Sequence, residues 1–135
     1  MKPLLFCFIT FVTTGIQSQN YIGLDSDSLK IVLKQNEKSF RIDNSTVNKV
    51  YKYLKYVDKI NEQTWLFFLD ENNVCTHHKL MSDYLNYNDT VQKLNEKFRS
   101  TGDKTWKYAD MGKEYTITLI EEEWFFTVIT KEKKD

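Results

Sequence analysis

Thr64-Trp65-Leu66-Phe67-Phe68-Leu69 is an almost continuous apolar run near the middle of the chain. A short run that is rich in aromatic residues favours a β-strand that is buried on both faces. We therefore predict that residues 64–69 form the central strand of a sheet. The polar stretch 70–73 that follows predicts a turn into another strand, which extends from Val74 to about Met81.

Further strands are predicted on both sides of this run. In residues 49–57, Tyr53 and Val57 fall on one face of a strand, while Leu54 and Tyr56 fall on the other. After residue 100, apolar side chains recur in three short segments separated by polar breaks. These segments are residues 105–108, 114–120 and 124–129.

Two segments carry the signals of amphipathic helices. The first begins within residues 24–28, which supply an N-cap and early carboxylates, and it repeats apolar residues at helical spacing until the polar run 35–38. The second begins near Asn88-Asp89 and is expected to end where Gly102 offers a left-handed position. We expect its polar face, which includes Lys93 and Lys97, to lie in solvent.

The predicted order is one helix and three strands, repeated once. It defines an α+β fold in which two similar halves share an antiparallel sheet, with both helices packed on one face. This order resembles the fold shared by the β-lactamase inhibitor protein and small envelope lipoproteins of the outer-membrane assembly machinery. In addition, residues 44–48, 53–58 and 66–69 are similar to stretches in small uncharacterised exported bacterial proteins. The resemblance implies export and a fold, and it implies no activity.

The N-terminus has the pattern of a secretory signal peptide. Lys2 precedes an apolar run over residues 4–12, and polar residues interrupt this run before it reaches the roughly 20 residues of a membrane span. Gly15 and Ser18 are both suitable last residues of the signal, and Ser18 is favoured. We assign residues 1–19 to the signal and residues 20–135 to a single domain that is periplasmic or secreted, without a stable membrane span. The alternative is that residues 4–16 form a buried helix of a cytosolic domain.

Composition narrows the classes of partner. The 135 residues hold 19 Lys and Arg against 19 Asp and Glu, and loss of Lys2 leaves 18 against 19. Such a neutral domain lacks the basic field that gathers nucleic acid, so no nucleic-acid partner is expected. Loss of Cys7 leaves Cys75 alone, so the core must hold the domain together without an internal disulfide.

The segment Cys75-Thr76-His77-His78 brings together one thiol and two imidazoles, which are potential metal ligands. In a regular strand Cys75 and His77 share a face and His78 points to the other, so at most two metal ligands converge. We predict no metal site, no cofactor and no catalytic residue. The alternative is a metal site in which Cys75 and His77 are the ligands. A cysteine hydrolase that combines Cys75, a histidine and Asp83 is the alternative enzyme.

Aromatic side chains suggest a recognition surface. Tyr and Trp are common at binding surfaces because they combine a flat apolar ring with a polar group. The predicted binding residues are Tyr51, Tyr53, Tyr56 and Trp65. We interpret the chain as an exported soluble binding or interaction module that uses a sheet face or the 43–48 loop against a protein or envelope partner. The alternative is a small exported hydrolase or a metal-binding protein built on the region of Cys75, His77 and His78, and the oligomeric state stays open.

Overall fold

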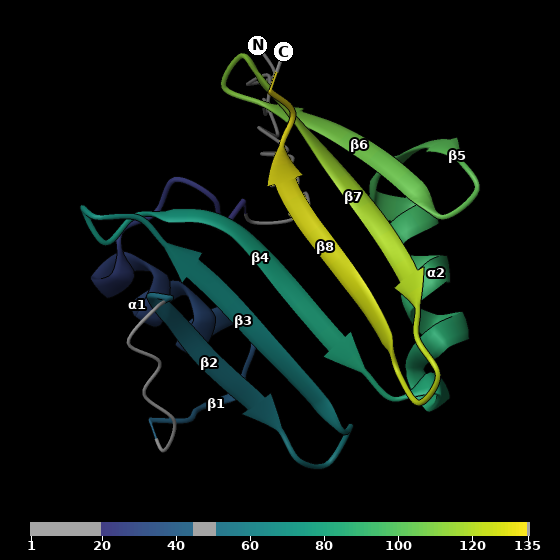
Figure 1. Cartoon of the computed structure of the whole chain (residues 1–135), viewed down its shortest axis with the longest axis horizontal. Coiled ribbons are helices and arrows are strands. Elements are labelled where there is room, and N and C mark those ends of the chain that lie inside the picture. Colours follow the sequence, from purple (N-terminus) through teal and green to yellow (C-terminus); the bar gives the residue numbers. More distant parts are fainter. Residues whose placement is uncertain (1–19, 45–50, 135) are drawn as a thin grey trace, which may run out of the picture.

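One antiparallel sheet of eight strands and two α-helices make up the fold, which is therefore α+β (Figure 1). The computed structural model describes residues 20–44 and 51–134. The predicted signal peptide and residues 45–48 of the predicted binding loop lie outside the described residues. The elements are α1 (Ser26–Asn36), β1 (Arg41–Ile42), β2 (Tyr53–Asp58), β3 (Gln63–Leu69), β4 (Cys75–Ser82), the 3-10 helix η1 (Tyr84–Asn86), α2 (Tyr87–Lys97), β5 (Arg99–Gly102), β6 (Thr105–Asp110), β7 (Lys113–Glu121) and β8 (Phe126–Glu132).

The strand order is symmetric about the middle of the sheet. It runs β1-β2-β3-β4-β8-β7-β6-β5, so each half is a meander of four neighbouring strands and the halves join where β4 pairs with β8. Residues 64–69 are therefore not central, because β8 returns to the middle of the sheet and pairs with β4. Four strands follow each helix instead of the predicted three, since the short strands β1 and β5 carry no clear apolar alternation.

The two helices differ in how they begin and end. The Asp25 carboxylate accepts a hydrogen bond from the Ser28 backbone N–H at 3.1 Å, which confirms the predicted cap of α1. The prediction that α2 ends at Gly102 is wrong. The helix stops at Lys97, Phe98 is already extended, and Gly102 lies within β5, where its φ is not positive.

A row of directly opposed residues shows which side chains share the face that contacts the helices. Directly opposed residues of paired strands point to the same face. The row consists of Leu54, Phe67, His78, Thr130, Ile117 and Trp106. Phe67 packs in the cluster that contains Leu29 and Leu33 of α1, whereas Trp106 packs with residues of α2. The side chains that contact α1 and those that contact α2 therefore belong to one face of the sheet.

The core is divided into two clusters. The first lies under α1 and contains Tyr21, Leu29, Leu33, Phe40, Tyr56, Phe67 and Cys75. The second lies under α2 and contains Trp106, Ile117, Leu119, Phe126 and Val128. Leu80 of β4 packs against both clusters. Apolar side chains therefore fill the space under each helix, and a cleft lies between the helices.

Within residues 20–44 and 51–134, neither helix has the length and apolar character needed to cross a membrane.

Candidate functional site: a cleft between the two helices

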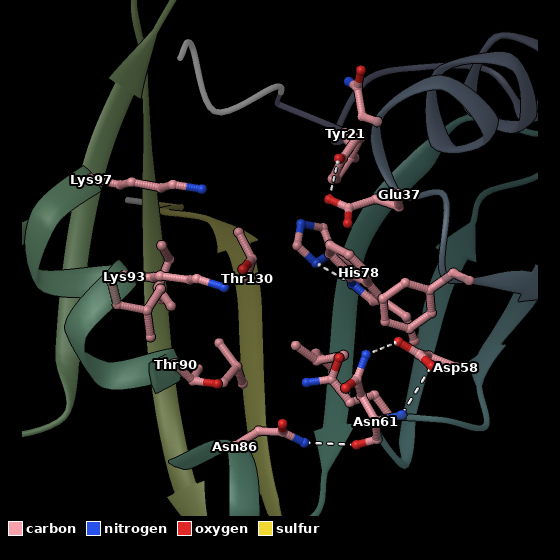
Figure 2. Close-up of a pocket in the computed structure, with 18 of the residues that line it drawn as sticks. Tyr21, Glu37, Asp58, Asn61, His78, Asn86, Thr90, Lys93, Lys97 and Thr130 are labelled. Carbon is pink, nitrogen blue, oxygen red and sulfur yellow. Dashed lines mark hydrogen bonds between the residues drawn. The ribbon is translucent and has the colours of Figure 1, made fainter. Parts of the chain in front are cut away.

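A cleft of about 830 Å³ lies between α1 and α2. Its floor comes from the sheet and includes Trp65, His78, Leu80, Val128 and Thr130. One wall is the C-terminal end of α1 with the residues that follow it, and the other wall is α2 (Figure 2). The cleft therefore contains residues from both halves of the chain.

Hydrogen bonds connect separate parts of the chain at both ends of the cleft. Near one end, which Tyr21 marks in Figure 2, the Asn20 amide donates to Asp110 at 3.1 Å and accepts from the Tyr108 hydroxyl at 3.0 Å. At the other end, the Asn86 amide donates to the Asn61 carbonyl oxygen at 2.7 Å. These bonds tie the segment before α1 to β6 and the start of α2 to the turn after β2, so they hold the cleft open in a fixed shape.

His78 on the floor is held in one protonation state. The Trp65 indole N–H donates to His78 Nδ1 at 3.0 Å, and burial lowers the pKa of His78 to about 3. The imidazole is therefore neutral, and because Nδ1 accepts, the proton is on Nε2. Within the described residues Nε2 has no hydrogen-bond partner and no buried side-chain nitrogen or oxygen is unsatisfied, so Nε2 opens to the cleft, as Figure 2 shows. The floor thus offers a fixed N–H donor.

An acidic group lies on the α1 wall. Glu37 caps the C-terminus of α1 and accepts a hydrogen bond from the Tyr21 hydroxyl at 3.0 Å. Burial raises the pKa of Glu37, while this hydrogen bond and the charges of Lys97 and Lys93 act in the opposite direction. Burial also raises the pKa of Tyr21, so the phenol stays a hydrogen-bond donor.

Two lysines extend from the α2 wall. Figure 2 shows Lys93 and Lys97 reaching from α2 toward the side of the cleft that holds Glu37 and His78. Lys93 forms a salt bridge with Asp89 at 2.9 Å, one helical turn earlier. Among the described residues Lys97 forms no salt bridge within 4.0 Å. The α2 wall therefore carries Lys93, Lys97 and the Asp89 carboxylate, and the α1 wall carries Glu37.

A second carboxylate on the α1 side has a structural role. Asp58 is buried and accepts hydrogen bonds from the backbone N–H groups of Ile60 and Asn61 at 3.0 and 3.1 Å, and from the Asn61 amide at 2.7 Å. Burial alone would raise its pKa, but these hydrogen bonds outweigh burial and lower it. Asp58 therefore shapes the turn between β2 and β3, and its charge is already satisfied.

The four predicted binding residues do not form one surface. Tyr56 is buried in the first core cluster, and Trp65 lies on the cleft floor. Tyr53 lies on the opposite face of the sheet, since it is next to Leu54 in β2 and its ring packs against Phe68. Tyr51 is exposed and precedes β2. Of the four, only Trp65 lines the cleft.

The predicted relation between Cys75 and His77 is wrong. The register shifts between Phe68 and Leu69, which pair with His77 and Cys75, so Thr76 has no partner in the ladder. This irregularity turns Cys75 into the first core cluster, while His77 stacks on Phe68 on the opposite face at 4.4 Å between ring centroids. No group of three or more potential metal ligands occurs among the residues that the structure describes.

The arrangement required for the alternative hydrolase is also not seen around Cys75. Burial raises the pKa of its thiol to about 12, so the thiol stays protonated and is a poor nucleophile. Asp83 accepts from the Leu85 backbone N–H at 2.8 Å and caps η1. Both side chains therefore have structural roles in the described part of the chain.

Sequence reasoning missed most of the cleft. The predicted exposure of Lys93 and Lys97 is confirmed, since both are exposed, but the sequence does not show that they border a cleft. In the sequence Glu37 belongs only to the polar run that ends α1. One signal was available: Thr90, Lys93 and Lys97 recur at helical spacing beside the apolar stripe of α2. The pattern marks one side of the helix, but it does not show that this side faces α1.

Comparison with known proteins gives no relative on which to base a function. No protein-family model, no curated protein and no solved structure matches the chain.

Proposed function

We propose that the mature chain is an exported, non-enzymatic binding module and that its ligand lies in the cleft between α1 and α2. The observation that carries this proposal is the cleft of about 830 Å³, which has a partly apolar floor and polar groups on both walls. Clefts of roughly 300–1,000 Å³ with a few fixed polar groups are the usual form of small-ligand sites. The ligand is a small molecule, or a short segment of a protein or envelope partner that enters the cleft.

The fixed geometry of the polar groups supports binding. The His78 proton is fixed by Trp65, and the ends of the cleft are tied by Asn20 and Asn86. A site that is already in its bound shape loses less conformational entropy when the ligand enters. The proposed framework is a pair of halves, each with one helix and a set of strands, whose helices stand on one face and leave the site between them.

Export is the second part of the proposal. It rests on the pattern of residues 1–19 and on the similarity of residues 44–48, 53–58 and 66–69 to stretches in small exported bacterial proteins.

A paired substitution on α2 tests the location of the site. We expect Thr90→Trp to fill the cleft, because Thr90 lines it, whereas Gln92→Trp adds the same ring to an exposed position of the same helix outside the lining. The ¹⁵N-labelled domain is titrated with separate amino acids, dipeptides, monosaccharides, carboxylic acids and nucleobases. At least one compound should shift amide signals in residues 35–37, 78–80 and 128–130.

The two variants decide the outcome. Thr90→Trp should abolish these shifts and Gln92→Trp should leave them unchanged. If no compound shifts these amides, or if the shifts persist in Thr90→Trp, the cleft is not the binding site and the proposal fails.

A further inference from the structure

We infer that the ligand of this cleft is a zwitterion of the amino-acid or short-peptide type, with its carboxylate at Lys97 and Lys93 and its ammonium group at Glu37. This inference rests on the proposed function and specifies the chemistry of the ligand.

The separation of charge across the cleft is the main argument. Glu37 is on the α1 wall, and the two lysines project from the α2 wall toward it (Figure 2). Glu37 has no salt bridge with either lysine within 4.0 Å, so the opposite charges face each other across open space. A ligand with a negative and a positive end can pair with both walls at once.

Ligands with a single charge fit this arrangement less well. An anion that approaches Lys97 also enters the field of Glu37. A cation that approaches Glu37 enters the field of Lys97 and of Lys93, although Lys93 is already paired with Asp89. Either ligand leaves one wall without a partner after water has been displaced. An uncharged ligand leaves both walls without one, which costs binding free energy.

The groups on the floor match the middle of such a ligand. His78 Nε2–H is a donor that opens to the cleft, and a peptide or carboxylate oxygen is a suitable acceptor. Beside it, Trp65 and Leu80 offer an apolar surface for a side chain. The cleft is larger than one amino acid requires, so a dipeptide is a fitting probe.

The test uses the dipeptide Ala-Phe and two analogues, each of which lacks one charge. Propionyl-Phe lacks the ammonium group, and alanine phenethylamide lacks the carboxylate. Isothermal titration of the mature domain should show that Ala-Phe binds about tenfold or more tightly than either analogue, because each analogue gives up one charge-assisted contact.

Two conservative variants should respond to different analogues. Glu37→Gln keeps an acceptor for Tyr21 and should weaken Ala-Phe by about tenfold while leaving propionyl-Phe unchanged. Lys97→Gln should weaken Ala-Phe by a similar factor and leave alanine phenethylamide unchanged. Lys30→Gln is the matched control, since Lys30 is exposed on α1 and outside the cleft, and it should bind like the unmodified domain. Circular dichroism and the melting temperature verify that each variant is folded.

Several results would overturn the inference. Propionyl-Phe or alanine phenethylamide binding as tightly as Ala-Phe would do so, as would equal effects of Glu37→Gln on Ala-Phe and propionyl-Phe. Absence of binding by Ala-Phe, free phenylalanine and free leucine at millimolar concentration would also do so. If a sugar or simple carboxylic acid still binds and Thr90→Trp blocks it, the cleft remains a binding site and only its assignment to zwitterions is lost.

Discussion

The contact between Trp65 and His78 joins the core to the cleft at the scale of single residues. The indole ring packs against Tyr21, Phe40 and Phe67, while its N–H fixes the imidazole of His78. Burial keeps His78 neutral in the folded chain. At a pH low enough to protonate this histidine in the unfolded chain, proton binding stabilises the unfolded state and not the folded state. This property makes the stability of the domain depend on pH.

We predict that acid weakens the fold through His78. Its pKa is about 3 in the folded chain, against roughly 6.5 when unfolded. Below about pH 6.5 the unfolded chain binds a proton that the folded chain does not, so the free energy of unfolding decreases as the pH falls, by up to about 1.4 kcal/mol per pH unit. Denaturant titrations between about pH 7 and 5.5 measure this slope before most carboxylates titrate.

The matched variants separate the two histidines. His78→Gln should flatten the slope, because glutamine can still accept from the Trp65 indole but does not titrate. His77→Gln should retain most of the slope, since His77 is only half-buried and its pKa is lowered less. An unchanged slope in His78→Gln would contradict this account.

At the scale of elements, the turn between β6 and β7 contains backbone strain that a single substitution can relieve. Asp110 pairs with Lys113, so Met111 and Gly112 form a two-residue turn, and both have positive φ, 50° and 79°. Such turns favour Asn-Gly, whereas methionine is disfavoured at positive φ. Met111 is also 95% exposed and contributes little packing.

We predict that Met111→Asn raises the free energy of unfolding by about 0.5–1 kcal/mol, with a higher melting temperature. Met111→Ile should lower both quantities, because a β-branched side chain resists positive φ more strongly. Thermal and denaturant unfolding measure the difference. A neutral or destabilising Met111→Asn would show that the hairpin is not under this strain.

The elements also show how far sequence patterns reach. The helix cap within residues 24–28, the alternation in β2 and the apolar run of β3 are local properties, so the sequence predicts them. The irregularity at Thr76 was not predictable, because it depends on how β4 pairs with β3. The position of β8 in the middle of the sheet depends on pairing with β4, about 50 residues earlier, and no periodicity encodes that choice.

For the whole molecule, the cleft depends on how the two halves meet. Glu37 and Trp65 come from one half, while Lys97 and Thr130 come from the other. No local pattern brings these residues together, so the sequence could not predict the polar site. The residue type of Trp65 suggests a binding role, but its place on the cleft floor follows only from the tertiary structure.

We predict that the signal is cleaved after Ser18, so that the exported chain begins at Gln19 and keeps the hydrogen bonds that Asn20 forms with Asp110 and Tyr108. A chain that begins at Ile22 should be less stable by about 3–5 kcal/mol, the usual cost of deleting a buried aromatic ring, since it lacks Tyr21. N-terminal sequencing of the secreted protein and thermal unfolding of both chains provide the measurements. An exported chain that retains Met1 would contradict the predicted processing.

The three tryptophans occupy three different surroundings, and this has a practical consequence for spectroscopy. Trp106 is enclosed in the second cluster with its N–H on Asn95, Trp124 is 79% exposed, and Trp65 alone lines the cleft. A compound that settles on the cleft floor alters the fluorescence emission of Trp65 directly, while Trp106 and Trp124 supply internal references for unfolding and for solvent quenching. The protein thus carries its own optical probe of occupancy, without an added label.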